Sequence, residues 1–121
     1  MKRLFHILFF SISPFVSFTI TGKSMIPTIT PGDRVIVRKR WFFCSLHVND
    51  IVALSDPRNG KSILKRIKKI KQPVRDGKCI FWSRKNDCMY FVLGDNPDES
   101  TDSRIFGWIS QENVIGKVSY Y

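Results

Sequence analysis

The sequence is poor in histidine and cysteine, and this scarcity excludes several kinds of catalytic site. Its two histidines, His6 and His47, have no carboxylate at a position that would orient an imidazole, so a Ser-His-Asp triad is hard to build. The three cysteines, Cys44, Cys79 and Cys88, form no CxxC pair and have no metal-like spacing with the histidines. We therefore expect no metal ion and no other cofactor. We expect three free, partly buried thiols; the alternative is a Cys79–Cys88 bridge across a hairpin in an oxidising compartment.

Acidic residues are also few: ten Asp and Glu stand against twenty Lys and Arg, which gives a net charge of +10. This excess favours anionic partners such as nucleic acid or lipid headgroups, although a solvated basic surface with no specific partner explains it equally well. There is no internal repeat and no low-complexity segment. A chain of 121 residues with 43% hydrophobic residues is long enough and apolar enough for one folded domain.

An uncharged apolar run, LFHILFFSISPFVSFTI at Leu4–Ile20, follows Lys2 and Arg3. Its length is near the lower limit of about 17 residues for a membrane-spanning helix. We interpret residues 1–20 as a transmembrane anchor or membrane-associated segment; a cleaved leader, an interfacial segment and a buried first strand or helix are the alternatives. Lys2 and Arg3 favour a cytoplasmic N-terminus, whereas the basic residues 38–40 argue for the opposite orientation.

The rest of the chain, residues 21–121, has the pattern of a mainly β domain. In DRVIVRKRW, residues 33–41, Val35 and Val37 share one face of an alternating run. Pro and Asn-Gly in DPRNG, residues 56–60, predict a turn. Further strands are expected at residues 50–54, 61–70 and 113–121, with two more, joined by a turn around residues 84–87, within residues 78–96. Short strands with little helical periodicity are typical of mainly β folds.

One lysine stands out within the basic segment KSILKRIKKI, residues 61–70. In a strand, Lys65 shares a face with Ile63 and Ile67. If that face is buried, the ammonium loses water, its pKa falls, and the neutral amine can act as a general base. Alternation also places Lys69 on this face, so the pattern does not single out Lys65. A fully solvated basic strand is the other interpretation.

Two further segments carry hydroxyl groups that could work with such a lysine. Ser24 lies in TGKSMIPTITPGDRVIV, where it is either a linker residue or a nucleophile that still needs a base. A Ser-Lys dyad needs no histidine. The segment LGDNPDESTDSRIFGWI contains Ser100, Asp102 and Arg104. It is either a self-bonded polar loop, with Arg104 paired to Asp102 or another carboxylate, or a loop that orients the lysine.

Together, GKSMIPTITPGDRVIV, ILKRI and LGDNPDESTDSRIFGWI resemble the sequence boxes of type I signal peptidases, in the same order and at separations that match a compact member. The first resembles the family's Ser-Met-x-Pro-Thr motif, the second its Lys-Arg strand, and the third its Gly-Asp-Asn…Ser-x-Asp-Ser-Arg…Gly segment. The resemblance implies a mainly β, signal-peptidase-like catalytic domain at residues 21–121, preceded by the membrane segment at residues 1–20.

The resemblance also implies the roles of individual residues. Ser24 matches the nucleophile, and its backbone N–H would supply part of an oxyanion hole. Lys65 matches the general base, and Ser100 matches the hydroxyl that hydrogen-bonds and orients the lysine. Asp102 and Arg104 match a structural pair that supports the site.

Three other positions follow from the same comparison. Gly22 stands where some relatives carry a second oxyanion-hole hydroxyl, and Met25 and Ile26 would line the substrate groove. The sequence departs from the family pattern after Lys65-Arg66, where it has IKKIKQPVRDG instead of a Gly-x-Pro-Gly-Asp-like turn. It also has no room for the larger second β domain of many bacterial members.

The resulting hypothesis is a membrane-associated serine endopeptidase that removes signal or leader peptides from precursor polypeptides. It would be single-pass, in contact with membrane lipid, with its catalytic domain on the extracytoplasmic side, and we expect no nucleic-acid partner. One alternative is a maturation protease for a single client, because the third box is also similar to proteases associated with nickel-type superoxide dismutase. Others are a cytosolic self-cleaving repressor-type protease and a basic binding module that uses aromatics such as Phe81 and Trp82 for stacking.

Overall fold

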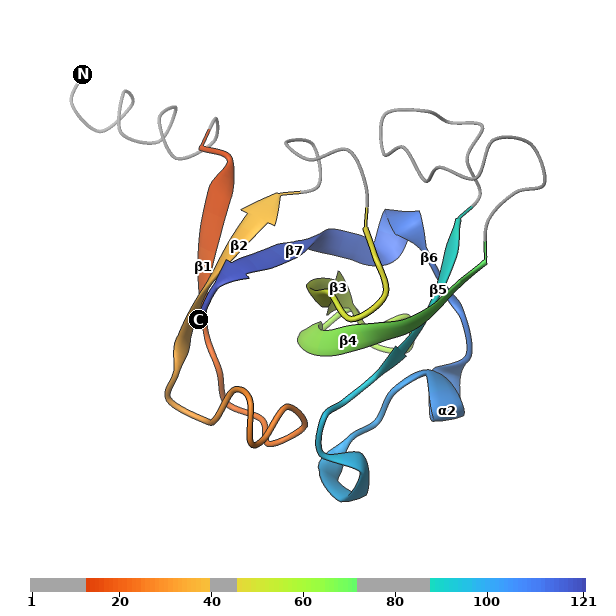
Figure 1. The fold of residues 1–121 in the computed structure, drawn as a ribbon, viewed down its shortest axis with the longest axis horizontal. Coiled ribbons are helices and arrows are strands. Elements are labelled where there is room, and N and C mark those ends of the chain that lie inside the picture. The colour runs from red at the N-terminus through yellow and green to blue at the C-terminus, as the bar shows by residue number, and fades with distance from the viewer. Residues whose placement is uncertain (1–12, 40–45, 72–87) are drawn as a thin grey trace.

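The computed structural model describes residues 13–39, 46–71 and 88–121, which form one curled antiparallel β sheet (Figure 1). The prediction of a mainly β fold is confirmed. The seven strands lie in the order β1-β2-β7-β3-β4-β5-β6. Their bounds are β1 Phe15–Thr19, β2 Arg34–Lys39, β3 Ile51–Ser55, β4 Ser62–Lys71, β5 Met89–Leu93, β6 Ile109–Ser110 and β7 Val114–Tyr120. Short helical turns occupy η2 Pro97–Glu99, α2 Ser103–Phe106 and η3 Gln111–Asn113.

Several elements follow directly from the local sequence. Val35 and Val37 are fully buried in β2, as their alternation predicts. The predicted turn at residues 56–60 joins β3 to β4, and Gly60 has a positive φ of 74°, which a glycine adopts without strain. The Asp56 side chain accepts a hydrogen bond from the backbone N–H of Arg58, a typical way for aspartate to close a turn.

Strand β3 separates two hydrophobic cores, which explains why its first four residues are buried. Val52 and Leu54 pack in one core, while Ile51 and Ala53 pack in the other, because side chains alternate across a strand. The first core also contains Leu46, Ile67, Cys88, Tyr90, Val92, Ile109 and Val114. The second contains Met25, Ile29, Val35, Val37, Leu64 and Val118.

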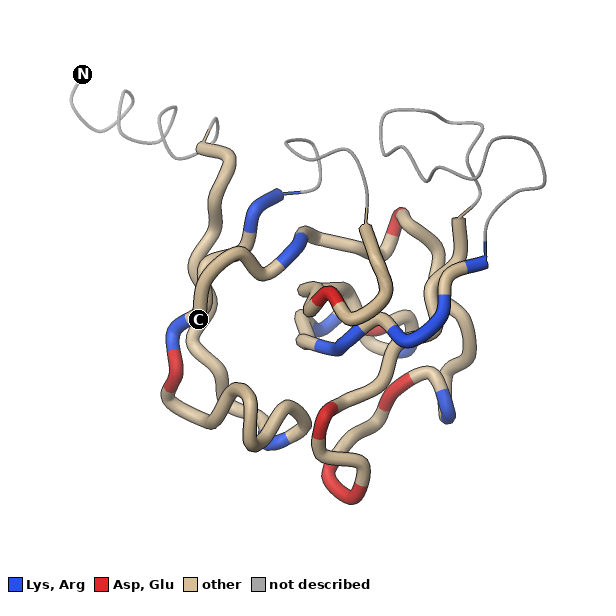
Figure 2. The backbone as a smooth tube through the Cα atoms, viewed as in Figure 1, with Lys and Arg blue, Asp and Glu red and all other residues tan. Residues whose placement is uncertain are grey.

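A β-bulge in β4 changes the predicted faces of its lysines. Ile67 pairs with Val92 and Lys69 pairs with the next residue, Phe91, so Lys68 is the extra residue on β4. Lys69 is therefore exposed, with its Nζ 5.7 Å from the centre of the Phe91 ring. The expectation that Lys69 shares the face of Lys65 is wrong. Figure 2 shows the basic residues of β4 along the sheet.

The N-terminal apolar run is divided in the structure. Its residues Phe15–Thr19 form β1, which pairs with β2 along its whole length. Residues 1–12 lie outside the described residues, so a membrane anchor there stays a prediction. Within residues 13–39, 46–71 and 88–121, no helix has the length and hydropathy needed to cross a bilayer.

Some other predictions concern residues that the structure does not describe. The strand expected before residues 84–87 is one of these, whereas the strand after them is β5. Cys88 is buried and disulfide-bonded. The expectation of three free thiols is therefore wrong. Both other cysteines lie outside the described residues, so the Cys79–Cys88 pairing stays a prediction.

Candidate active site

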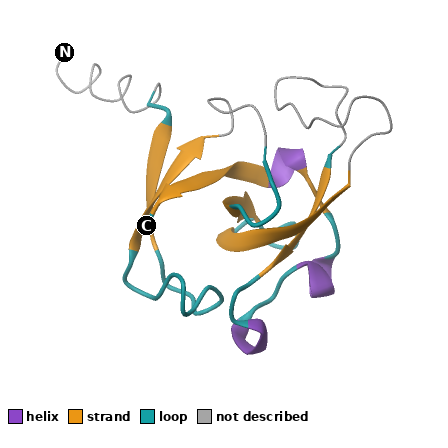
Figure 3. Cartoon of the chain, viewed as in Figure 1, coloured by secondary structure: helices purple, strands orange, loops and turns teal. Residues whose placement is uncertain are grey.

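The serine loop between β1 and β2 is held in place by a buried anchor and by the loop that follows β5. Met25 is 2% exposed and packs in the second core, directly after Ser24. On the other side, the backbone N–H of Asn96 donates to Ser24 O at 2.8 Å, and Asn96 Nδ2 donates to Lys23 O at 3.1 Å. The two loops consequently lie side by side, as Figure 3 shows.

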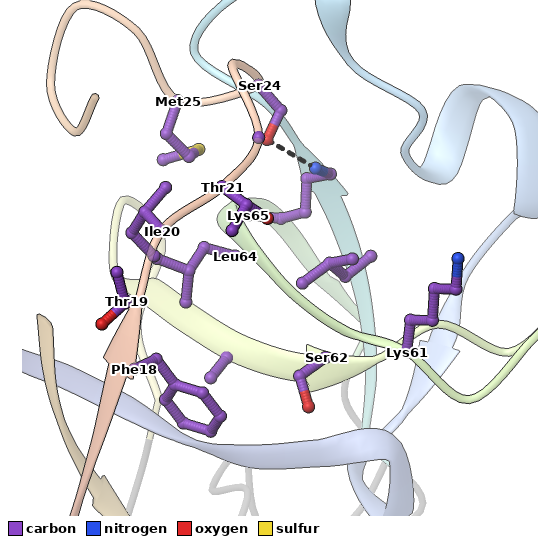
Figure 4. A pocket seen from close by; sticks show the side chains of 13 residues that line it. Phe18, Thr19, Ile20, Thr21, Ser24, Met25, Lys61, Ser62, Leu64 and Lys65 are labelled. Carbon is purple, nitrogen blue, oxygen red and sulfur yellow. Dashed lines mark hydrogen bonds between the residues drawn. The ribbon is translucent and has the colours of Figure 1, made fainter. Parts of the chain in front are cut away.

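The Lys65 side chain extends from β4 to the serine loop between β1 and β2. Its Nζ lies 2.9 Å from Ser24 Oγ, although the two residues are 41 positions apart in the chain (Figure 4). Lys65 is only 3% exposed. Burial lowers the pKa of its ammonium, and the negative charges of Asp102 and Asp56 oppose this shift. The arrangement is that of a hydroxyl paired with a base whose neutral form is accessible nearer to physiological pH.

Asp102 is a fully buried carboxylate that collects hydrogen bonds from three residues. It accepts from Arg104 Nε at 2.9 Å, from Ser100 Oγ at 2.8 Å and from the backbone N–H of Gly94 at 3.0 Å. Burial raises the pKa of Asp102, but these hydrogen bonds outweigh it and hold the pKa at about 2. Asp102 is thus charged at neutral pH, and the predicted Asp102–Arg104 pair is present.

Ser100 lies in this cluster but does not make the contact expected of it. Its hydroxyl hydrogen is directed to Asp102, whereas the hydrogen bond described for Lys65 is with Ser24. Its oxygen can still accept a hydrogen bond. The role of Ser100 in orienting the lysine stays a prediction.

Gly94, the glycine of the Gly-Asp-Asn segment, is a further residue on which the geometry of the site depends. A Cβ at this position would overlap Ser100 Oγ and would come within 2.6 Å of Ser24 O. The absence of a side chain therefore allows the loop after β5 to approach the serine loop. The signal in the sequence was the glycine of the Gly-Asp-Asn turn.

A second hydrogen-bond network, which was not predicted from the sequence, connects all three sequence boxes. Arg66 donates from Nε and Nη2 to the two oxygens of Asp95, at 2.9 and 2.8 Å. Thr28 Oγ1 donates to Asp95 Oδ2 at 2.6 Å. The hydrogen bond from Arg66 is the main cause of a lowered pKa for Asp95. Each of these residues lies next to, or a few positions from, a residue already predicted for the site.

Asp56 is another buried carboxylate, 3% exposed, at the start of the β3–β4 turn. Arg58 neutralises it through Nε and Nη2, at 3.1 and 2.8 Å from its two oxygens. The hydrogen bond from Arg58 is the largest cause of the lowered pKa of Asp56. The Arg58 guanidinium also lies 5.8 Å from the centre of the Phe106 ring, which connects this turn to α2.

A pocket of about 250 Å³ opens beside Ser24 and Lys65 (Figure 4). One wall is residues 18–22, and the other is residues 61–65. Its apolar lining includes Phe18, Met25, Ala53 and Leu64. Met25 thus lies where the groove was predicted. Gly22 lines the pocket too, and a Cβ added to it would meet nothing within 4 Å. Ile26, the other residue predicted for the groove, is half-buried and does not line this pocket.

Both walls of the pocket present unpaired strand edges. β1 is at the end of the sheet order, so one of its edges has no neighbour within the described residues. β4 pairs with β5 only from Arg66 onwards, so within the described part of the chain residues 62–65 have no partner strand on that side. An extended peptide between these two edges could hydrogen-bond to both.

No group of three or more His, Cys, Asp or Glu side chains in the described part of the chain is placed to hold a metal ion.

Comparison with known proteins points to the same family that the three sequence boxes resemble. A family model described as "Signal peptidase, peptidase S26" matches residues 3–70 and 78–121. "Probable signal peptidase I-1" of Synechocystis sp. is 27% identical over 80% of this chain and 65% of that protein. "Signal peptidase I U" of Bacillus subtilis is 29% identical over 84% of this chain and 72% of its own length, and "Signal peptidase I" of Bacillus caldolyticus is 28% identical over 88% and 78%. The match thus spans just under two thirds of the Synechocystis protein.

Proposed function

Because the chain belongs to the peptidase S26 family of signal peptidases, we propose that it is a serine endopeptidase with a Ser24–Lys65 catalytic dyad. The observation that carries this proposal is the 2.9 Å contact between Ser24 Oγ and Lys65 Nζ, made by a lysine that is 3% exposed. A buried amine with a lowered pKa is suited to accept the serine proton.

In the proposed reaction, the neutral amine of Lys65 takes the proton from Ser24 Oγ as the oxygen attacks the peptide carbonyl carbon. The oxyanion that forms would accept a hydrogen bond from the backbone N–H of Ser24. The C–N bond then breaks, and the Lys65 ammonium returns the proton to the departing amine. Water, deprotonated by the same lysine, hydrolyses the acyl-serine ester and releases the free enzyme.

The supporting residues would act by positioning. Asp102 binds Arg104, Ser100 and the backbone of Gly94, which stabilises the loop after β5 against the serine loop. Its negative charge also favours the protonated form of Lys65 and so limits how far burial lowers the lysine pKa. Ser100 would orient Lys65 by accepting a hydrogen bond through the oxygen lone pairs left free by its bond to Asp102.

The substrate would bind as an extended strand between β1 and β4. The backbone N–H of Ile20 donates to Asp33 O, and its carbonyl accepts from Gly32 N. The backbone N–H and C=O groups of the neighbouring residues Thr19 and Thr21 therefore point the other way, toward the pocket. On the facing wall, Lys61 O accepts from Asp56 N, so alternation turns the backbone groups of Ser62 and Leu64 outward. Main-chain bonds would give affinity, and the small pocket favours small side chains at the first and third residues before the cleaved bond.

We propose precursor polypeptides with signal or leader peptides as the substrates. Membrane association belongs to the same proposal, and the apolar run Leu4–Ile20 supports it even though Phe15–Thr19 are part of the sheet. The disulfide of Cys88 supports an extracytoplasmic catalytic domain, because structural disulfides persist in oxidising compartments. Carbonate extraction of membranes would separate an integral anchor from peripheral attachment.

A direct test is to incubate the full chain, purified in detergent, with a panel of leader peptides and short pro-segments, and to read the cut sites by mass spectrometry. We expect cleavage after small residues in leader peptides, with Ser24→Ala as the inactive control. Cleavage confined to one pro-segment would favour a dedicated maturation protease. Cleavage that persists in Ser24→Ala would contradict the proposal.

A further inference from the structure

Two lysines line the pocket, and only one of them has a role in the proposed reaction. Lys65 lies beside Ser24, while Lys61 lies farther along the same wall (Figure 4). Lys61 is exposed. Lys61 therefore places an ammonium group where a bound substrate could form an ion pair with it.

The backbone of Lys61 is fixed at the end of the β3–β4 turn. Its N–H donates to Asn59 Oδ1 at 2.9 Å, and its carbonyl accepts from the N–H of Asp56 at 2.8 Å. The side chain is flexible, but its origin on the pocket wall is set by these two bonds.

No carboxylate within the described residues lies at ion-pair distance from the Lys61 ammonium. The nearest acidic residue in its own turn, Asp56, is buried and already held by Arg58 through both oxygens. The other pocket-lining side chains apart from Lys65 are apolar or hydroxyl-bearing, such as Thr19, Thr21 and Ser62. Lys61 is thus a positive charge in the pocket whose partner could come from the substrate.

The geometry of β4 assigns Lys61 to one substrate position. Lys61 directly precedes β4 and continues the face of Ile63 and Lys65, whereas Ser62 and Leu64 point to the other face, as Figure 4 shows for the labelled residues. Lys61 and Lys65 are about 13 Å apart along the strand, at about 3.3 Å per residue. We count the substrate residues backwards from the cleaved bond. If a substrate strand alongside β4 directs its first and third side chains toward Leu64 and Ser62, its second and fourth side chains point to the face of Lys61 and Lys65.

We propose that Lys61 is a specificity residue that favours an acidic side chain at the fourth residue before the cleaved bond of the substrate. This inference rests on the proposed function, under which the segment before the cleaved bond occupies the pocket. Exposed ion pairs are worth roughly 0.2–1 kcal/mol, so the expected preference for Glu over Gln at this position is about 1.4- to fivefold in kcat/KM. Salt screening should reduce it.

The test uses a leader peptide that the wild-type protein cleaves, synthesised with Gln, Glu or Lys at the fourth residue before the bond. A second series carries the same three residues at the second position after the bond. The ratio of kcat/KM for Glu and Gln peptides is measured for the wild type, Lys61→Gln and Lys61→Glu at low and at high salt. Lys71→Gln is the matched control, because Lys71 is exposed at the other end of β4 and does not line the pocket.

We expect the Glu preference in the wild type and in Lys71→Gln, its loss in Lys61→Gln, and a preference for the Lys peptide in Lys61→Glu. The preference should be confined to the position before the bond and should weaken in high salt. A Glu:Gln ratio near one in a wild type that cleaves the Gln peptide well would overturn this inference alone. The same ratio in Lys61→Gln as in the wild type would also overturn it. Failure to cleave any peptide would overturn the proposed function as well.

Discussion

Arg66 and Asp95 form a bidentate ion pair that connects strand β4, next to the proposed base, with the loop that covers the serine. Both side chains are largely buried, and Arg66 Nη1 also donates to the carbonyl of Asn49 at 2.7 Å. Because Thr28 donates to the same carboxylate, the pair fixes the spacing between the serine loop and β4. This spacing determines whether Ser24 and Lys65 meet.

We expect Arg66→Lys to destabilise the fold by about 1–3 kcal/mol, because lysine keeps the charge but cannot form the two parallel hydrogen bonds. Thermal or denaturant unfolding would measure this loss, and kcat should fall because the loops lose their spacing. Arg34→Lys, at an exposed position on β2, is the control and should leave the unfolding midpoint unchanged. Equal midpoints for the two variants would show that the bidentate geometry contributes nothing.

The proposed dyad predicts that Ser24→Ala and Lys65→Met each reduce kcat by several orders of magnitude, roughly 10⁴-fold or more, while the fold is kept. Their effects should not add, since the two residues act as one unit. Single-turnover cleavage of a leader peptide measures the activity, and circular dichroism checks the fold. Near wild-type turnover in either variant would refute the dyad.

The lowered pKa of Lys65 predicts the pH dependence of cleavage. The reaction needs the neutral amine, so kcat should rise with pH through the lysine pKa and should fall at acidic pH as the amine becomes charged. This midpoint should lie below the ordinary lysine value of 10.5. Rates measured across the pH range with one neutral peptide would test it. A rate that does not change with pH would argue against a lysine base.

We expect Gly94→Ala to destabilise the fold, because the added Cβ would clash with Ser100 and with the backbone of Ser24. Overpacking of this kind costs about 1–3 kcal/mol, or displaces the loops. The melting temperature should therefore fall, together with the rate of peptide cleavage. Gly22→Ala is the matched control for stability, since a Cβ there meets nothing within 4 Å. Similar melting temperatures for both variants would contradict the close-packing argument.

Local pattern was sufficient for much of the fold. The alternation of Val35 and Val37 identified β2, and the Pro and Asn-Gly of residues 56–60 identified the turn before β4. These features depend on near neighbours in the chain, so they can be read from the sequence. The same holds for the Asp102–Arg104 pair, whose members are two positions apart.

Features that depend on pairing between distant segments could not be read in this way. Alternation placed Lys65 and Lys69 on one face, and only the bulge opposite Val92 and Phe91 moved Lys69 into solvent. A bulge depends on the register of the partner strand, which the sequence of one strand does not specify. The Arg66–Asp95 pair was missed for a similar reason, because its residues are 29 positions apart.

By itself, the sequence determined the mainly β class, the turn at residues 56–60 and the three segments from which the site residues come. Ser24 and Lys65 could be named because their segments resemble those of a known family, and not because spacing in the chain brings them together. Their 2.9 Å separation, the burial of Lys65 and the close approach allowed by Gly94 were decided by the tertiary structure. The physical reason is that a contact across 41 residues depends on sheet register and loop packing, which arise only when the whole domain folds.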